Sequence, residues 1–348
     1  MSFRHPLLRT ACMAAATPAD IARVHHGLAA ATADPYRRAR HLAAATPSPD
    51  ASVPAILEAA ADGALGRGDH LAGRVALRSA AEHSATTDDA ARRYAQASFA
   101  AHRSGQPQVA DELAEKVTAM TADPDLTGIA ACSTGFALLH PARPEQAFEL
   151  TARAARRRPR DGQVTLTAVV VAAAATLLSG SGAHRKQLPG LLDLVGQSAA
   201  GELEASMFPY PQTALARAAV STINDPAGST GLCPEWASTA AAGPTRMLFT
   251  GTIAFLRDKS TKAAVDLGAT CDGGAPGSAL AFYPLMVLAL IGSGRLAEAD
   301  RMLDRGTLPP VIADRRIAPV PDLCGARCRE PASVAGAVGH VAVTRAVD

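Results

Sequence analysis

The chain has 348 residues and a formal net charge of +2 at pH 7, and 48% of its residues are hydrophobic. A charge this close to balance gives no reason to expect nucleic acid or an anionic membrane as a partner. Aromatic residues make up only 4% while alanine dominates the apolar set, and alanine is the strongest helix former, so the composition favours packed helices over sheets.

The cysteines and the first residues both predict a cytoplasmic location. The six cysteines are sparse and lie mostly within alanine-rich, helix-like stretches, which favours reduced thiols in a protein core. They stand at positions 12, 132, 233, 271, 324 and 328. The first six residues, MSFRHP, lack the long apolar region of a secretory signal.

Two apolar stretches are candidates for membrane spans. Val164–Leu178 has 15 residues and Ala279–Ile291 has 13, with Pro284 inside it. Both are shorter than the roughly 20 residues that a spanning helix needs. We therefore expect each to be a helix buried on all sides, and we expect no contact with a membrane.

The chain opens with a series of helix signals. Thr17 is suited to cap a helix that starts at Pro18, and Asp20 completes a capping box. Asp34-Pro35 predicts the start of a second helix, which runs to about Ala45 before the break at 46–50. The next helix has one apolar face at helical spacing, formed by Val53, Ile56, Leu57, Ala60, Ala61 and Ala64.

A unit of helix, short glycine turn and helix then recurs. Second helices of this unit begin near Gly68, near Gly105 (37 positions later), near Arg143 (38 later) and again near Gly292. The helices that precede them are predicted over Val53–Leu65, Asp89–Arg103, Leu126–His140 and Ala279–Ile291. This is the pattern of tetratricopeptide-like repeats, whose helix pairs must stack to bury their apolar faces. The sequence therefore predicts an all-α, tetratricopeptide-like helical-repeat solenoid of antiparallel helix pairs.

The middle of the chain is less regular, and the end loses the pattern. A break is expected at 180–183 and a loop at 225–234, with helices elsewhere over Leu188–Val195, Ala214–Thr222, Leu248–Leu256 and Thr261–Leu267. The last two are predicted to form a further helix pair. Prolines interrupt the pattern from about Pro309, and we expect Asp322–Asp348 to be poorly ordered.

Candidates for chemistry are few. No G-x-x-x-x-G-K-[ST] phosphate loop occurs, and Lys259-Ser260 has no glycine loop before it. The glycine-rich stretch 273–277 contains a proline and is interpreted as a turn, and the adjacent His25 and His26 are interpreted as solvated surface. Cys324 and Cys328 have only His340 after them, too few ligands for structural zinc. We expect no enzyme activity, no cofactor and no metal site.

A basic run lies near the end of one predicted helix, at Arg153, Arg156, Arg157, Arg158 and Arg160. Arginines in a last helical turn complement the helix dipole, and this accounts for the run. The alternative is a nucleic-acid surface, which would need a recognition motif as well.

Several segments resemble one family. Residues 3–11 read FRHPLLRTA and are similar to an F-x-H-P-L-[LV]-R-x-A stretch of the large ATP-binding LuxR-type transcriptional regulators of actinobacteria. The segment from Thr17 to His25 resembles the family's S-P-x-x-R-x-x-x-H helix, and 40–45 (RHLAAA) resembles its R/W-H-L-A-x-A segment. Residues 58–61 and 68–81 resemble its first helix pair. The resemblance is specific over about residues 3–120 and continues as helical repeats to about 305.

The resemblance implies an arrangement of domains and a function. Such regulators carry a P-loop ATPase, a winged-helix element, a long helical-repeat region and a C-terminal helix-turn-helix. This sequence contains neither the P-loop nor the L-T-x-R-E-x-x-V-L pattern of the helix-turn-helix. Residues 1–49 would be a helical remnant that follows the family's ATPase and winged-helix module, 50–308 the helical-repeat domain, and 309–348 an irregular or disordered tail.

The resemblance therefore implies the effector- or protein-binding region of a LuxR-family regulator. Its partner would be a protein or a small-molecule effector, with no direct nucleic-acid contact. Three alternatives remain open: a DNA-binding regulator that uses the basic surface around residues 153–160, a standalone protein-interaction scaffold, and an enzyme with an all-α site, for which the only support is that a chain of 348 residues has room for a cleft.

Overall fold

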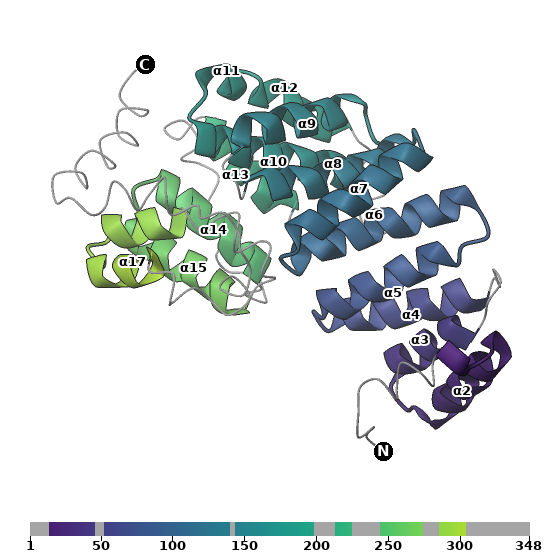
Figure 1. The fold of residues 1–348 in the computed structure, drawn as a ribbon. Helices are drawn as coiled ribbons and strands as arrows, with labels where there is room; N and C mark the ends of the chain where they lie inside the picture. The colour runs from purple at the N-terminus through teal and green to yellow at the C-terminus, as the bar shows by residue number, and fades with distance from the viewer. Residues whose placement is uncertain are drawn as a thin grey trace.

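The structure, a computed structural model, describes residues 14–45, 52–139, 143–197, 213–224, 244–273 and 285–303. Every regular element in these ranges is a helix, and consecutive helices pack against one another (Figure 1). The predicted all-α fold of stacked helix pairs is confirmed.

The helices are named in chain order. They are α2 (Pro18–Ala31), α3 (Pro35–Ala45), α4 (Ser52–Gly66), α5 (His70–Glu82), α6 (Thr87–Arg103), α7 (Pro107–Met120), α8 (Pro124–Leu139), α9 (Pro144–Arg156), α10 (Gly162–Ser179), α11 (Gly182–Arg185), α12 (Leu188–Gln197), α13 (Thr213–Asn224), α14 (Pro244–Leu256), α15 (Ser260–Gly273) and α17 (Leu296–Leu303). Residues 285–292 are also helical.

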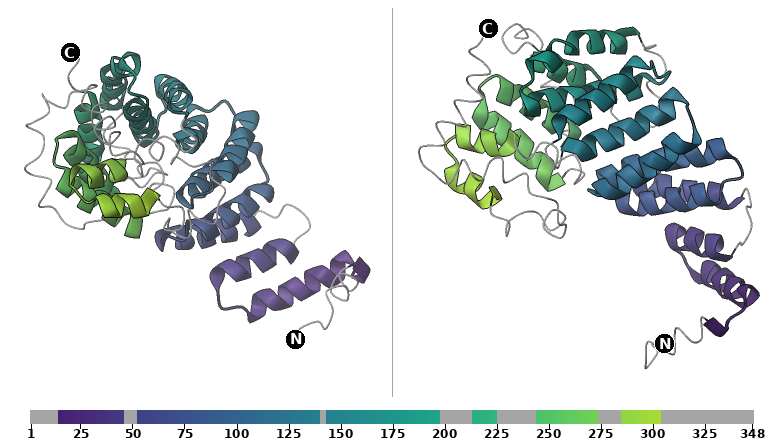
Figure 2. Two further views of the ribbon diagram at one scale, coloured as in Figure 1. Left: turned by 60° about the vertical axis from the view of Figure 1, so that its left-hand side comes forward. Right: turned by 45° about the horizontal axis from the view of Figure 1, so that its top comes forward.

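The helices form an arc with α2 and α3 at one end and α14, α15 and α17 at the other (Figures 1 and 2). The pairs α4/α5, α6/α7 and α8/α9 follow one another, and α14/α15 forms a later pair. The first helices of successive pairs also touch, because α6 packs on α8 and α8 packs on α10. Each helix is therefore held by its partner within the pair and by helices of the neighbouring pairs.

One turn recurs between the two helices of a pair. In each case a backbone N–H donates to the carbonyl five residues earlier, the long hydrogen bond of a Schellman helix end. The donors and acceptors are Asp69 to Ala64, Gln106 to Ala101, Arg143 to Leu138, Lys259 to Ala254 and Arg295 to Leu290, at 2.9 to 3.0 Å. The first three donors are spaced 37 residues apart, so the weak sequence repeat corresponds to a true structural repeat.

These turns require a left-handed residue just before the donor. Gly68, Gly105 and Gly294 have positive φ angles of 78°, 69° and 77°, which glycine adopts without strain. Asp258 takes the same place between α14 and α15 with a φ of 59°. The sequence predicted these two helices as a further pair, although their turn lacks the glycine of the others.

Small side chains set the distances between helices. Alanine is the commonest residue in the main buried apolar core, a single cluster of described residues between Ala61 and Ala299. A second, smaller core joins α3 to α4 and α5 through Ala39, Leu57 and Ala80. At Gly135 of α8, an added methyl would lie 2.6 Å from Thr151 Cγ2 of α9 and 3.0 Å from Val171 Cγ1 of α10. Helices α8, α9 and α10 therefore meet at a point where only hydrogen fits.

Helix α10 is the only helix among the described residues that is long and apolar enough to cross a bilayer, with a mean hydropathy of 1.7. Inside the protein, 78% of its 18 residues are buried. It packs against α8, α9, α12 and α13, and this burial accounts for its apolar composition.

The predicted helices Leu188–Val195, Ala214–Thr222, Leu248–Leu256 and Thr261–Leu267 are present, each longer by one or more residues. The break after α10 is also present, with Gly180 left-handed. The short helix α11 follows at once and was missed: Ser181 Oγ accepts from the N–H of His184 and caps it. The predicted loop 225–234, the residues 279–284 of a predicted helix, and the tail 309–348 lie outside the described residues.

The contact at Gly135 leads to a stability prediction. The side chain of Thr151 is held in place by its hydroxyl, which donates to the Ala147 carbonyl at 2.8 Å, so its methyl group cannot rotate away. We expect Gly135→Ala to lower the free energy of unfolding by about 1 to 3 kcal/mol, because the added methyl overpacks the contact. Urea unfolding followed by circular dichroism measures this.

The matched control is Gly63→Ala in the exposed interior of α4, where the nearest atom to the new methyl is the flexible Arg67 guanidinium at 3.5 Å. Alanine there should raise stability by about 0.5 to 1 kcal/mol through helix propensity. Equal gains at both positions would contradict the close contact of α8, α9 and α10.

Candidate functional site

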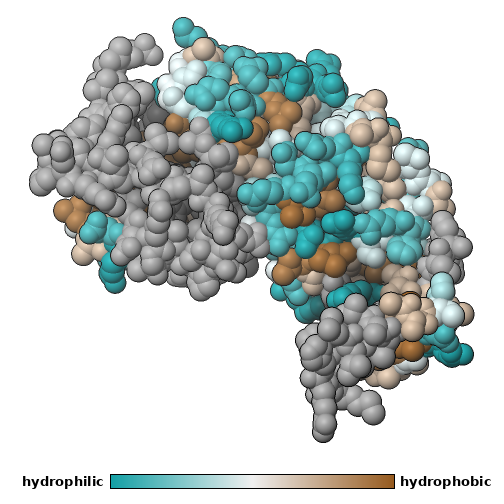
Figure 3. Space-filling view, in the orientation of Figure 1, coloured by the Kyte–Doolittle hydropathy of each residue, from teal (hydrophilic) through white to brown (hydrophobic). Residues whose placement is uncertain are grey.

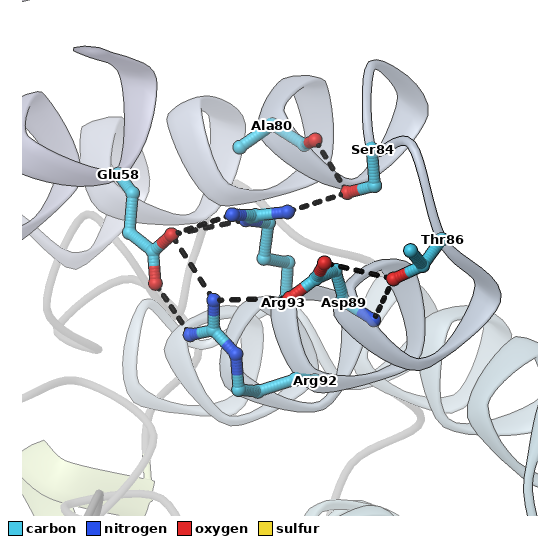
Figure 4. A network of polar contacts seen from close by, with 7 residues as sticks. All are labelled: Glu58, Ala80, Ser84, Thr86, Asp89, Arg92 and Arg93. Carbon is cyan, nitrogen blue, oxygen red and sulfur yellow. Dashed lines mark hydrogen bonds and ion pairs between the residues drawn. The ribbon is translucent and has the colours of Figure 1, made fainter. Parts of the chain in front are cut away.

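A polar network connects α4, α5 and α6 (Figure 4). The Glu58 carboxylate of α4 accepts hydrogen bonds from both Arg92 and Arg93 of α6, at 3.0 Å from Arg93 Nε. Arg93 Nη1 also donates to Ser84 Oγ at 2.7 Å, and Ser84 Oγ donates to the Ala80 carbonyl at 2.9 Å. One carboxylate thus ties neighbouring helix pairs together.

The electrostatics of this network favour a structural role. The hydrogen bond from Arg92 lowers the pKa of the Glu58 carboxyl below its ordinary value of 4.5, against the opposing effect of partial burial. A carboxylate held between two guanidinium groups is a poor general base, because its charge is already stabilised. The sequence reasoning missed this network. Its signal was the spacing of Glu58 from Arg92 and Arg93 by 34 and 35 residues, about one repeat.

Other polar side chains also join successive pairs. Ser98 Oγ of α6 lies 3.0 Å from Ser133 Oγ of α8, 35 residues later. Arg160, before α10, reaches back to Asp123 and Asp125 at 2.5 and 3.2 Å. These contacts hold repeats in register.

The buried histidines act as flat packing groups. His102 stacks on Phe136 with ring centroids 4.2 Å apart, and His184 stacks on Phe148 at 3.9 Å. His184 Nε2 also lies 3.8 Å from the Glu149 carboxylate. These rings lie in helix contacts, which accounts for their placement.

His25 and His26, interpreted as solvated surface, have different environments. His26 is exposed, but His25 of α2 is half-buried and its Nδ1 lies 3.0 Å from Nδ1 of His41 in α3. One ring donates and the other accepts in this contact. The two segments that resemble the regulator family therefore meet through these two histidines.

The remaining candidates that lie within the described residues show no sign of an activated group. Lys259 and Ser260 form the turn into α15, where Ser260 is the first helical residue. Cys132 is fully buried, and burial raises the pKa of its thiol, which leaves a poor nucleophile. Within the described ranges, no three His, Cys, Asp or Glu side chains lie close enough to hold a metal ion. Residues 274–277, Cys324, Cys328 and His340 lie outside those ranges.

The basic run of α9 is one part of a larger basic surface, defined here by Arg153, Arg156, Arg157, Arg158 and Lys186. All five are exposed. Arg156 donates to the Gln187 side chain at 2.5 Å, which places Lys186, just after α11, beside the end of α9. Within the described residues, none of the five forms an ion pair with a carboxylate. Arg160 is separate because it is bound to Asp123 and Asp125.

The helix dipole explains only part of this surface. Arg153 and Arg156 lie in the last turn of α9, but Arg158 and Lys186 lie beyond it. Arg158 is also left-handed, with a φ of 54°, at the place where helices usually end in glycine. A non-glycine residue there costs about 1 to 2 kcal/mol.

On the face seen in Figure 3, hydrophobic colour gathers in small separate patches among hydrophilic residues over the middle helices. Individual exposed apolar side chains include Val24 and Leu28 of α2 and Val265 of α15.

A scan against protein-family models and searches of curated proteins and of solved structures found no match to this chain.

The Glu58 network leads to a prediction on stability. Glu58→Gln should lower the free energy of unfolding by about 1 to 3 kcal/mol, because two guanidinium groups lose their carboxylate in a partly buried place. The matched control is Glu82→Gln, which removes an exposed i,i+4 pair with Arg78 and should change stability by less than about 0.5 kcal/mol.

The same variant has a predicted pH dependence. Because the folded pKa of Glu58 is lowered, its stabilisation is present above its ordinary value of 4.5 and is lost as pH falls through the lowered pKa. The stability difference between wild type and Glu58→Gln should therefore shrink in acid. A difference that stays constant down to the acid transition would contradict the ion pairs.

His70 leads to a second pH prediction. Its pKa is lowered to about 4, mainly by burial, with a further lowering by the charge of Arg103 and an opposing effect of Asp69. Between about pH 6.5 and 4, the unfolded chain therefore binds a proton at His70 that the folded chain does not bind. His70 should make the free energy of unfolding decrease as the pH is lowered through this window. Wild type should show this slope, and His70→Gln should reduce it. An NMR titration midpoint for His70 near 6.5 would contradict the burial.

Proposed function

We propose that this chain is the helical-repeat region of a LuxR-type, ATP-binding transcriptional regulator, and that it acts by binding a protein partner or a small effector. The observation that carries the proposal is the arc of stacked helix pairs, in which side chains from neighbouring pairs hold one repeat on the next (Figures 1 and 4). Such arcs offer extended surfaces made from many helices, which is how repeat proteins bind their partners.

The assignment to this regulator family rests on the resemblance over about residues 3–120. The contact between His25 and His41 supports it, because two separate segments that resemble the family pack together as one helical hairpin. We include a cytoplasmic location and the absence of catalysis in the proposal. The described polar groups serve to connect helices: Glu58 binds two arginines, and Asp123 and Asp125 bind Arg160.

The test is thermal melting followed by circular dichroism, on the chain alone and with a separately expressed ATPase module of a LuxR-type regulator. We expect a cooperative helical melt whose midpoint rises by about 5 °C when the module is present at about a hundred times Kd. In the family that the chain resembles, this module precedes the segment matched by residues 3–11. The contact is therefore expected at the α2 end of the arc.

A pair of matched variants locates the contact. Val24 of α2 and Val265 of α15 are both 59% exposed, at opposite ends of the arc. Val24→Ser should reduce the stabilisation by the module, whereas Val265→Ser should leave it unchanged. A chain that folds cooperatively but shows no stabilisation by ATPase modules or by effector libraries would contradict the proposal.

A further inference from the structure

The basic surface at the end of α9 and just after α11 gathers five exposed cations from two parts of the chain. Some arginines elsewhere on this chain are bound to carboxylates, as Arg92 and Arg93 are to Glu58 and Arg160 is to Asp123 and Asp125. Arg153, Arg156, Arg157, Arg158 and Lys186 are exposed and form no such ion pair within the described ranges. We propose that this surface docks a short, carboxylate-rich segment of a partner protein. The inference rests on the proposed function and names the chemistry of the partner.

The surface combines two parts of the chain. Arg153, Arg156 and Arg157 lie three and four residues apart, so they share one face of α9. The hydrogen bond from Arg156 to Gln187 brings the turn that contains Lys186 beside α9. Arginine guanidinium groups bind carboxylates with two parallel hydrogen bonds, so a cluster of them fits a run of Asp or Glu side chains.

Arg158 strengthens the argument. The turns at Gly68, Gly105 and Gly294 use glycine for the left-handed residue, whereas the turn after α9 holds an arginine in that strained conformation. Residues kept in strained conformations gather at functional sites. Glycine would form this turn without strain, whereas arginine adds a positive charge to the surface and strains the backbone.

The borders of the surface favour a short acidic segment over nucleic acid. Glu149, one turn before Arg153, is 68% exposed, and Asp123 and Asp125 lie on the side of Arg160. These carboxylates would repel a long phosphate backbone, and duplex DNA is usually held by many phosphate contacts. The five residues also include no aromatic side chain for stacking on bases. A few carboxylates in a row match the small extent of the surface.

The experiment measures fluorescence anisotropy of the full chain with a labelled peptide in which Glu alternates with Ser. Its controls are the same peptide with Gln in place of Glu and a labelled duplex DNA. We expect binding of the Glu peptide only, weakening as salt rises from about 50 to 200 mM. Arg153→Ala with Arg157→Ala should raise Kd about tenfold. The control Arg23→Ala removes an exposed arginine of α2 that is paired with Asp20 and should leave Kd unchanged.

Arg158→Gly separates docking from folding. Glycine suits the left-handed turn, so this variant should melt at a higher temperature than wild type while it binds the peptide more weakly. A purely structural role for Arg158 would give the higher melting temperature with unchanged Kd.

Two outcomes overturn the inference. Peptide binding that is absent or unaffected by the double variant would show that this surface does not dock acidic segments. Tighter binding to the duplex DNA than to the peptide at the same salt would make it a nucleic-acid surface. Either result leaves the melting test with the ATPase module independent, so failure of this inference and failure of the proposed function can be told apart.

Discussion

Close approach between neighbouring helices is the constraint on which the rest of this structure depends. Gly135 of α8 leaves no room for a methyl group beside Thr151 and Val171, and Gly128 is equally close to Val164 of α10. The alanine-rich core lets neighbouring helices approach closely along the rest of the arc as well. Short distances between helices allow small side chains to bury fully and to pack densely, which compensates for the scarcity of aromatic residues. They also fix the angle and register at which each pair meets the next.

The turn between the two helices of a pair is the second constraint on the structure. The same Schellman hydrogen bond appears at five turns, and it sets the direction of the second helix each time. Because the turn repeats, the pairs stack in the same sense and produce an arc instead of a compact bundle (Figure 2). Polar contacts such as Glu58 with Arg92 and Arg93 then lock one pair to the next. Stability and shape thus come from nearest neighbours, as in other repeat proteins.

The placement of charged side chains bears on function. The charges between repeats are neutralised by partners within the chain, whereas the charges of the basic surface face outward. The regulator proposal and the acidic-segment inference use different parts of the arc, the α2 end and the α9–α11 surface. Under both proposals, the chain would act by fixing the distance and orientation of its partners.

The sequence by itself determined the fold class and most helix positions, since alanine content, proline and threonine caps and glycine turns act locally. Thr17, Pro18 and Asp20 start α2 through contacts within a single turn, and the capping box is present in the structure. It also indicated the repeat, through glycines spaced by 37 positions. Local signals failed at the very short helix α11. Only the tertiary structure decided that Glu58 meets Arg92 and Arg93, that His25 meets His41 and that Lys186 lies beside the end of α9. Those contacts depend on how helices pack on one another, and this packing joins residues some 16 to 37 positions apart, which no local pattern encodes.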